Sequence, residues 1–146
     1  MTHLTEHFTL EEFTLSQTAA RKGFDNDPPP KELANLQRTA ETLEKVRARL
    51  GDHPVLISSG YRCHAVNHAV GGSKNSAHMH GLAADFTCPG FGAPLAICRQ
   101  LEEQMAELGI DQLIHEFGAW VHLGLSDEPR HMAMTIDHAG TRHGFG

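Results

Sequence analysis

The stretch between Glu32 and Leu50 constrains the fold more than any other part of this chain. Leucine and valine recur along it at helical spacing, which is typical of a helix with one apolar face. The proline-rich residues 25–30 before it cannot be helical, and Gly51 after it is suited to end a helix. The pattern therefore predicts one long amphipathic helix over residues 32–50.

Shorter segments on both sides of this helix are also predicted to be regular. The other predicted helices cover residues 8–13, capped by Thr9, a turn through 67–70, and 93–108, ended by Gly109. The predicted strands cover residues 55–58, 82–86, 112–116 and 120–123. The last two strands flank a short connection that contains glycine, which is typical of a hairpin. Residues 126–146 show no clear periodicity, so we expect an irregular tail there.

Length and composition indicate one globular domain over residues 1–146. The chain has 146 residues, of which 40% are apolar and 21% are charged, and a chain of that size can bury a core of its own. The formal net charge is -6, and clustered Lys and Arg are lacking. Nucleic acid is therefore excluded as a partner, because its binding depends on such clusters.

The sequence also disfavours a membrane-spanning protein and a protein built on disulfide bonds. No apolar run approaches the roughly 18 residues of a membrane span, and the first ten residues do not resemble a signal peptide. We therefore expect that the chain is synthesised in the cytoplasm and does not insert into a membrane. The three cysteines show no metal-binding spacing and cannot all pair with one another, so we expect reduced thiols.

A candidate metal site stands out among the 12 histidines. His78 precedes Asp85 by seven positions, and His122 lies further along the chain. Zinc prefers imidazole nitrogen and carboxylate oxygen, and a catalytic zinc site uses three protein ligands with one open position. If Asp85 and His122 lie on adjacent antiparallel strands, their side chains can project into one cleft, which His78 would complete from a loop.

Three motifs in the same order are similar to the zinc D-Ala-D-Ala carboxypeptidase family, peptidase family M15, which includes phage endolysins. The motifs are Ser59-Gly60-Tyr61-Arg62, Ser76-x-His78-x-x-Gly81-x-Ala83-x-Asp85 and Trp120-Val121-His122. The similarity extends from about Phe8 to about Leu125, and the three motifs together are far more specific than any one of them.

The resemblance implies an α+β fold in which helices flank a small antiparallel sheet, as in the Hedgehog and D-Ala-D-Ala peptidases. It implies one zinc ion per chain, held by His78, Asp85 and His122, and a peptidoglycan stem peptide as substrate. Arg62 matches the family arginine that steadies the substrate and the oxyanion. A guanidinium is always charged and offers paired donors, which suits that role.

The position of the predicted catalytic base in the sequence departs from the family pattern. Many relatives carry a carboxylate three positions before the last ligand, where this chain has Ala119. Glu116, at the end of the preceding strand, faces His122 if the connection is a tight turn, because paired strands bring opposed side chains within roughly 5 Å. We therefore predict that Glu116 is the base. Asp111 is the alternative, with capping or turning the chain as its other role.

Three further residues of the motifs are candidates for contact with substrate: Ser76, His80 and Tyr61. Ser76 is equally suited to a structural hydrogen bond, and His80 to a solvent-exposed position beside Gly81. The single tryptophan, Trp120, alternates with His122 along its strand. It can wall the cleft or pack in the core.

The resulting prediction is a zinc metallopeptidase that cuts stem peptides, either as a D-Ala-D-Ala carboxypeptidase or as an endolysin endopeptidase. We expect a monomer, and the lack of a signal peptide favours a phage enzyme that reaches the cell wall after release. Ala119 leaves open a second interpretation, a catalytically inactive zinc module that binds the wall or assembles into a virion. A third, a metal buffer, would bind several zinc ions weakly through its many histidines.

Overall fold

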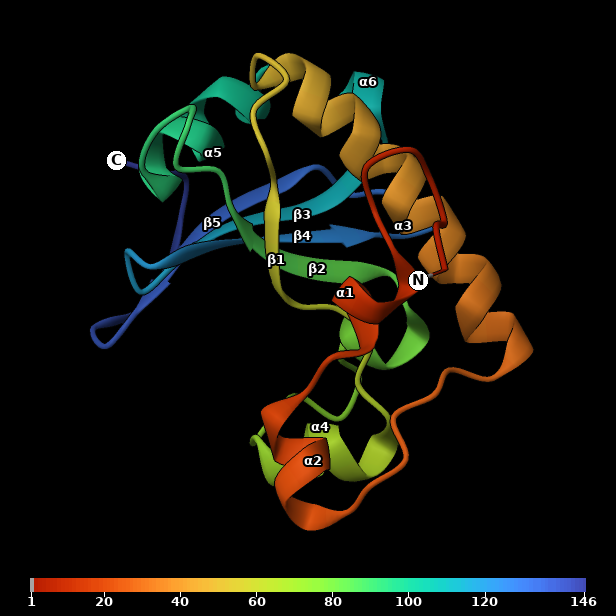
Figure 1. Ribbon diagram of the computed structural model, residues 1–146. Coiled ribbons are helices and arrows are strands. Elements are labelled where there is room, and N and C mark those ends of the chain that lie inside the picture. Colours follow the sequence, from red (N-terminus) through yellow and green to blue (C-terminus); the bar gives the residue numbers. More distant parts are fainter. Residues whose placement is uncertain (1) are drawn as a thin grey trace.

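A six-stranded sheet organises the computed structural model, which describes residues 2–146 (Figure 1). The strands are β1 (Leu56–Ser59), β2 (Ala83–Thr87), β3 (Ile110–Glu116), β4 (Trp120–Leu125), β5 (Met132–Asp137) and β6 (Gly140–His143). Their order in the sheet is β1-β2-β4-β3-β5-β6. All neighbouring strands are antiparallel except β3 and β5, which are parallel. The α+β class is confirmed, but the sheet is mixed and not purely antiparallel.

The long helix predicted from the sequence is present as α3. The helices are α1 (Leu10–Thr14), α2 (Gln17–Lys22), α3 (Pro30–Arg49), α4 (His64–Ala69), the 3-10 turn η1 (Ala77–His80), α5 (Pro94–Glu102) and α6 (Met105–Leu108). Helix α3 begins at Pro30 because proline needs no hydrogen-bond acceptor in the first turn, and its fixed φ suits that position. Gly51 follows the end of α3 in the left-handed conformation, with φ 77°.

Two details of the helices differ from the predictions. The single helix expected over 93–108 is divided into α5 and α6, because the chain leaves helical geometry at Gln104, with φ -115° and ψ 8°. Helix α2 was not predicted, although its ends carry ordinary signals. The Ser16 hydroxyl accepts a hydrogen bond from the Ala19 N–H, and Gly23 ends the helix with φ 71°.

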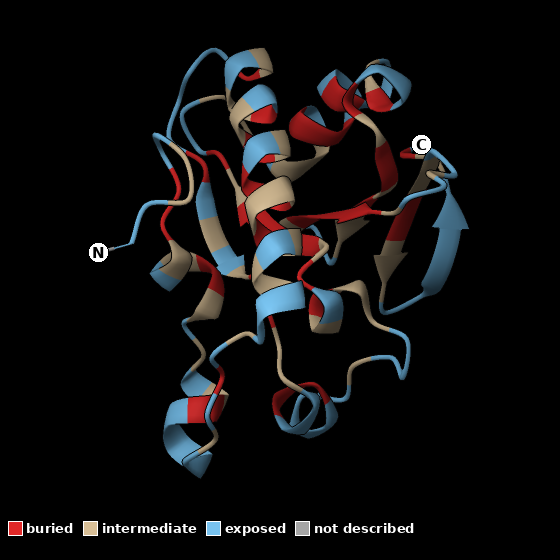
Figure 2. Ribbon diagram, turned by 90° about the vertical axis from the view of Figure 1, so that its right-hand side faces the viewer, coloured by how far each residue is buried: buried red, intermediate tan, exposed pale blue. Residues whose placement is uncertain are grey.

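The two faces of the sheet have different roles because side chains alternate along each strand. On one face, Phe86, Val121 and Leu123 are fully buried in the core with residues of α3, α5 and α6. The opposite face carries Asp85 and His122, which alternate with those core residues. Figure 2 shows buried residues along the central strands, whereas β6 is exposed along its whole length.

The C-terminal segment corrects the expectation of an irregular tail. Strand β4 ends beside the start of β3, since Leu125 pairs with Ile110. The connection over 126–131 can therefore be short and still bring β5 alongside β3, with Met132 next to Gln112. A tight turn at 137–140 then leads into β6. Among residues 2–146, none of the helices combines the length and apolar character that a membrane span requires.

An ion pair fixes the start of β5 to the irregular start of β3. Asp111 lies in the β-bulge of β3 and is buried. Its two carboxylate oxygens accept hydrogen bonds from Arg130 Nε and Nη2 at 2.9 and 2.8 Å, and Oδ1 also accepts one from the Arg130 backbone N–H. Asp111 therefore has a structural role, but it anchors the chain through Arg130, whereas the role considered for it was capping or turning the chain.

We expect Asp111→Asn to lower the free energy of unfolding by about 1 kcal/mol at pH 7. Hydrogen bonds from Arg130 hold the pKa of Asp111 below the ordinary value of 3.8. The stabilisation is therefore complete above that value and is lost as the pH falls through the lowered folded-state pKa. Urea unfolding of the wild type and the variant at pH 7 and at pH 2.5 measures the difference.

Asp127→Asn is the matched control, because Asp127 pairs with Arg38 but is 93% exposed. We expect a smaller loss at pH 7 for this variant. An Asp111 effect that persists undiminished in acid, or an Asp127 effect of the same size, would contradict the assignment.

Candidate metal centre and active site

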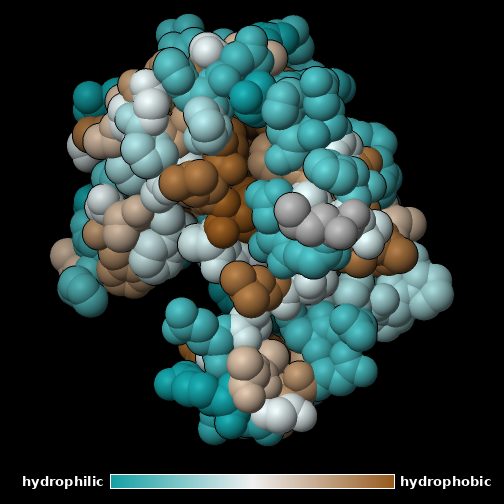
Figure 3. Space-filling model, viewed as in Figure 1, coloured by the Kyte–Doolittle hydropathy of each residue, from teal (hydrophilic) through white to brown (hydrophobic). Residues whose placement is uncertain are grey.

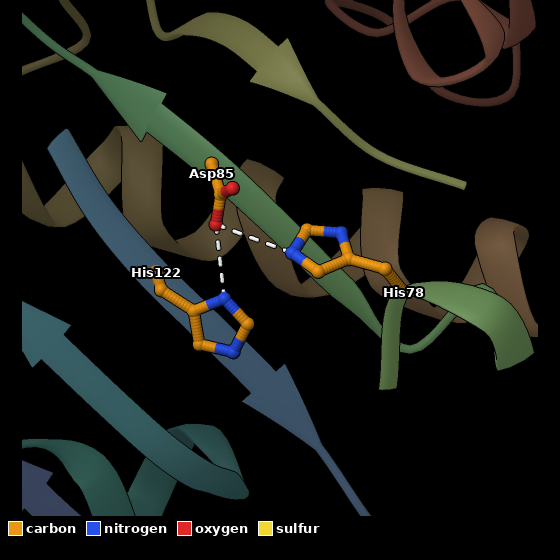
Figure 4. Close-up of side chains that lie close together, drawn as sticks. All are labelled: His78, Asp85 and His122. Carbon is orange, nitrogen blue, oxygen red and sulfur yellow. Dashed lines mark hydrogen bonds and ion pairs between the residues drawn. The ribbon is translucent and has the colours of Figure 1, made fainter. Parts of the chain in front are cut away.

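Three buried side chains from three elements meet on the face of the sheet opposite the core. His78 comes from η1, Asp85 from β2 and His122 from β4, and they point toward one another (Figure 4). Asp85 and His122 are direct partners in the β2–β4 register, as the sequence predicted for adjacent antiparallel strands. Asp85 Oδ1 lies 2.9 Å from His122 Nδ1 and 3.3 Å from His78 Nε2.

These distances fit a divalent metal ion of the zinc type. Donor atoms at about 2.0–2.2 Å from a tetrahedral ion stand about 3.3–3.5 Å apart. The three candidate ligand atoms lie within 4.8 Å of one another, so only small movements separate them from that geometry. Two imidazoles and one carboxylate form the donor set of a catalytic zinc site, in which a fourth position stays open.

His78 is oriented for metal binding by the backbone of the Ser-Gly-Tyr-Arg segment. Its Nδ1 lies 2.7 Å from the Gly60 carbonyl oxygen, so Nδ1–H donates to that carbonyl and Nε2 faces Asp85 with its lone pair. Burial lowers the pKa of His78 and favours the neutral ring. Neutral imidazole is the form that binds a metal ion.

Asp85 remains charged although it is buried. Burial alone would raise its pKa, but the interactions with the two imidazoles, above all the hydrogen bond from His122, outweigh burial and hold the pKa of Asp85 far below its usual range. An Asp85 carboxylate between two imidazoles is therefore an anionic centre, ready to bind a cation at neutral pH.

Glu116 extends this group along β3. Its Oε1 lies 3.9 Å from His122 Nδ1, while its Oε2 accepts a hydrogen bond of 3.1 Å from Trp120 Nε1. The direct partner of Glu116 across the hairpin is Trp120, and His122 is paired with Ile114. Glu116 therefore reaches His122 diagonally and not from the opposed position that we predicted. Burial raises the pKa of Glu116, which suits a group that accepts and returns a proton.

Arg62 approaches the same group from the other side. Its Nη2 lies 3.7 Å from Asp85 Oδ2, and its backbone N–H donates to the His78 carbonyl oxygen at 3.1 Å. Asn26 binds the backbone on both sides of Arg62. Its Oδ1 accepts a hydrogen bond from the Cys63 N–H, and its Nδ2 donates one to the Tyr61 carbonyl oxygen. The backbone that carries Arg62 is therefore fixed next to the metal group, and the guanidinium reaches Asp85 from it.

Asn67 contacts Arg62 and was not identified from the sequence. It is buried, its Oδ1 lies 3.4 Å from Arg62 Nη1, and its Nδ2 donates to the Ser73 carbonyl oxygen at 2.9 Å. A Cβ atom on Gly72 would lie only 2.1 Å from Asn67 Oδ1. Glycine at position 72 therefore allows the loop to close over Asn67. The glycines of this loop were the sequence signal that could have indicated such a close approach.

We expect Gly72→Ala to lower the free energy of unfolding by about 1–3 kcal/mol, because the new methyl group displaces a buried amide that has two partners. Urea unfolding measures the loss. Gly92→Ala is the control, since the nearest atom to its new methyl group is the Ala96 Cβ at 3.4 Å. Equal stability of the two variants would contradict this role of Gly72.

The metal group lies in a cleft of about 870 Å³ between the sheet and the lobe that contains α4. Figure 3 shows the molecule indented between its upper part and this lobe. Ser76 and His80 line the cleft. The Ser76 hydroxyl also accepts a hydrogen bond from the His78 N–H, and His80 is exposed. Tyr61 is buried in the core and does not line this cleft, because its backbone runs between α1 and η1 and turns its ring inward.

Comparison with known proteins identifies the family. The model of the family described as Peptidase M15 matches residues 6–124. The chain belongs to the peptidase M15 family. The matched range of this M15 chain includes the three candidate ligands, Arg62 and Glu116, and it ends just before the connection to β5.

One curated relative of this M15 chain is the zinc D-Ala-D-Ala carboxypeptidase of Streptomyces albus G. It is 42% identical over 52 residues, which cover 36% of the chain. The matched part spans 20% of that protein's length. The family predicted from the three sequence motifs is thereby confirmed.

Proposed function

We propose that this chain is a zinc-dependent peptidase that hydrolyses peptide bonds in the stem peptides of peptidoglycan. The observation that carries the proposal is the buried group of His78, Asp85 and His122 with the Glu116 carboxylate beside it. Membership of a peptidase family and the name of the Streptomyces relative support zinc as the metal and cell-wall peptides as the substrate.

Each residue of the site has a separate part in this reaction. Zinc, when bound, supplies a Lewis acid that polarises the scissile carbonyl and makes water a better nucleophile at neutral pH. Glu116 accepts a proton from the attacking water and returns it to the leaving nitrogen. Arg62 stabilises the negative charge that develops on the carbonyl oxygen. His78 and Asp85 keep their orientation through the contacts with Gly60 and His122.

The inactive zinc module is less well supported than the peptidase. That alternative depended on Ala119, which occupies the position where many relatives carry the base. Glu116 lies 3.9 Å from His122 Nδ1 and is half-buried at the cleft, so a carboxylate is available without an acid at position 119.

The proposal includes two cleavage reactions, and one experiment separates them. The zinc-loaded protein is incubated with purified peptidoglycan and with a synthetic stem pentapeptide that ends in D-Ala-D-Ala, and the products are identified by mass spectrometry. Release of D-alanine from the pentapeptide indicates a carboxypeptidase. New amino termini in peptidoglycan without release of D-alanine indicate an endopeptidase, the activity of an endolysin.

The same assay includes the outcome that overturns the proposal. If the protein binds one zinc ion tightly but yields neither product, it is not a stem-peptide peptidase and the inactive module is the better account. Several weakly bound zinc ions would instead favour the metal buffer.

A further inference from the structure

The β5–β6 hairpin lies outside residues 6–124, the part that matches the family, yet it contacts the turn that directly follows Glu116. Glu116 is next to Ile136 in the β3–β5 register. The Phe117 N–H donates to the Ile136 carbonyl oxygen at 2.7 Å. The imidazole of His138, in the β5–β6 turn, lies 5.0 Å from the Phe117 ring between centroids. The C-terminal hairpin therefore fixes the conformation of the β3–β4 turn.

Phe117 is held in an unfavourable conformation at this contact. Its φ is +53°, which is uncommon for a bulky side chain, and the residue is 42% exposed. Such strain is retained only where the surroundings impose it, and it often occurs close to functional sites. Here the Phe117 ring is placed between His138 and Trp120, whose ring centroid is 5.7 Å away.

Trp120 connects this aromatic group to the carboxylate of Glu116. Its indole N–H donates to Glu116 Oε2 at 3.1 Å, which leaves Oε1 facing His122 Nδ1. A glutamate side chain has several rotatable bonds, so an unrestrained Glu116 would lose configurational entropy each time it reached the reactive position. The indole keeps one oxygen in place and thereby directs the other toward the metal group.

We propose that Trp120 is a positioning residue for Glu116 and that Phe117 and His138 hold its indole in place, so that the C-terminal hairpin takes part in peptide hydrolysis. This inference rests on the proposed function, because it assigns Glu116 the role of base. Trp120 acts through Glu116, to which its indole N–H donates, and it is not among the residues that line the cleft.

The decisive variant removes only the indole N–H. Because the chain contains one tryptophan, growth on β-(3-benzothienyl)alanine in place of tryptophan changes only residue 120 and keeps the shape of the ring. We expect kcat on stem peptide to fall about 10-fold, the effect of losing one hydrogen bond to a charged group. KM and the affinity for zinc are expected to stay the same. An unchanged kcat would overturn the proposal.

A second readout needs no substrate and separates this inference from the proposed function. In the zinc-loaded protein, Glu116→Ala removes the acceptor of the indole N–H and is expected to shift the fluorescence emission of Trp120. Glu128→Ala is the control, because Glu128 is an exposed carboxylate of the same cleft. If the wild type has no peptidase activity but the emission shifts, the function fails and the contact stands. If Glu116→Ala leaves the emission unchanged, the contact itself is wrong.

Phe117→Gly tests the role of the hairpin without disturbing the backbone, because glycine adopts a positive φ readily. Relief of strain is expected to keep the melting temperature at or above that of the wild type, whereas kcat falls several-fold because Trp120 loses its support. A merely structural role of Phe117 predicts a lower melting temperature with unchanged kcat, and that result would overturn the proposal.

Discussion

Exchange of Glu116 for glutamine is expected to lower kcat on stem peptides by about 100- to 10,000-fold, the usual contribution of a general base. Glutamine keeps the shape of the side chain, and its amide oxygen can still accept the hydrogen bond from Trp120, but it cannot take up a proton. Zinc content is expected to stay at one ion per chain, because the metal group consists of His78, Asp85 and His122. Steady-state kinetics and metal analysis of the same preparation measure both quantities.

Asp111→Asn is the control for the choice of base, because Asp111 was the other acid considered and it also lines the cleft. Its carboxylate is fully engaged by Arg130, so we expect this variant to keep its kcat despite its lower stability. If the loss of activity followed Asp111 and not Glu116, the assignment of the base would be wrong.

Exchange of Asp85 for alanine is expected to lower zinc affinity by more than about 100-fold, which exceeds the 10- to 100-fold effect of losing an outer partner of a ligand. Asp85 supplies the only carboxylate of the three-residue group found in residues 2–146, and it contacts both imidazoles. Competition with a fluorescent zinc indicator measures the affinity.

His68→Ala is the matched control, because His68 is an exposed histidine on α4 outside the metal group. We expect its zinc affinity to equal that of the wild type. An Asp85→Ala variant that binds zinc as tightly as this control would show that the metal lies elsewhere.

The elements that could be predicted from the sequence are those whose signals are local. Helix α3 follows from apolar spacing between a proline run and a glycine, and the β3–β4 hairpin follows from two apolar runs around Gly118. Strand β5 was missed although Met132, Met134 and Ile136 alternate along it. Its place depends on pairing with β3, and that pairing connects segments distant in sequence.

In the candidate site, too, the residues with local sequence signals could be predicted and those that depend on tertiary contacts could not. The motifs were sufficient to propose three ligands, and the structure brings all three together. The positions of Glu116 and Trp120 depend on the register of the hairpin, in which these two residues are direct partners. The contact of Asn67 with Arg62 depends on how closely Gly72 approaches, and the glycines of that loop were a signal without a partner residue. Tyr61 lies within a matched motif, but its ring is buried.

Zinc K-edge X-ray absorption of the zinc-loaded protein tests the metal centre most directly. The predicted spectrum contains two imidazole ligands and oxygen ligands at about 2.0–2.2 Å, with no sulfur, in four-coordinate geometry. This result corresponds to His78, His122, Asp85 and a water molecule at the fourth position. Sulfur at about 2.3 Å would mean that cysteine binds the metal, and a first shell without imidazole would exclude both histidines. Either result would contradict the site from which the proposed function was derived.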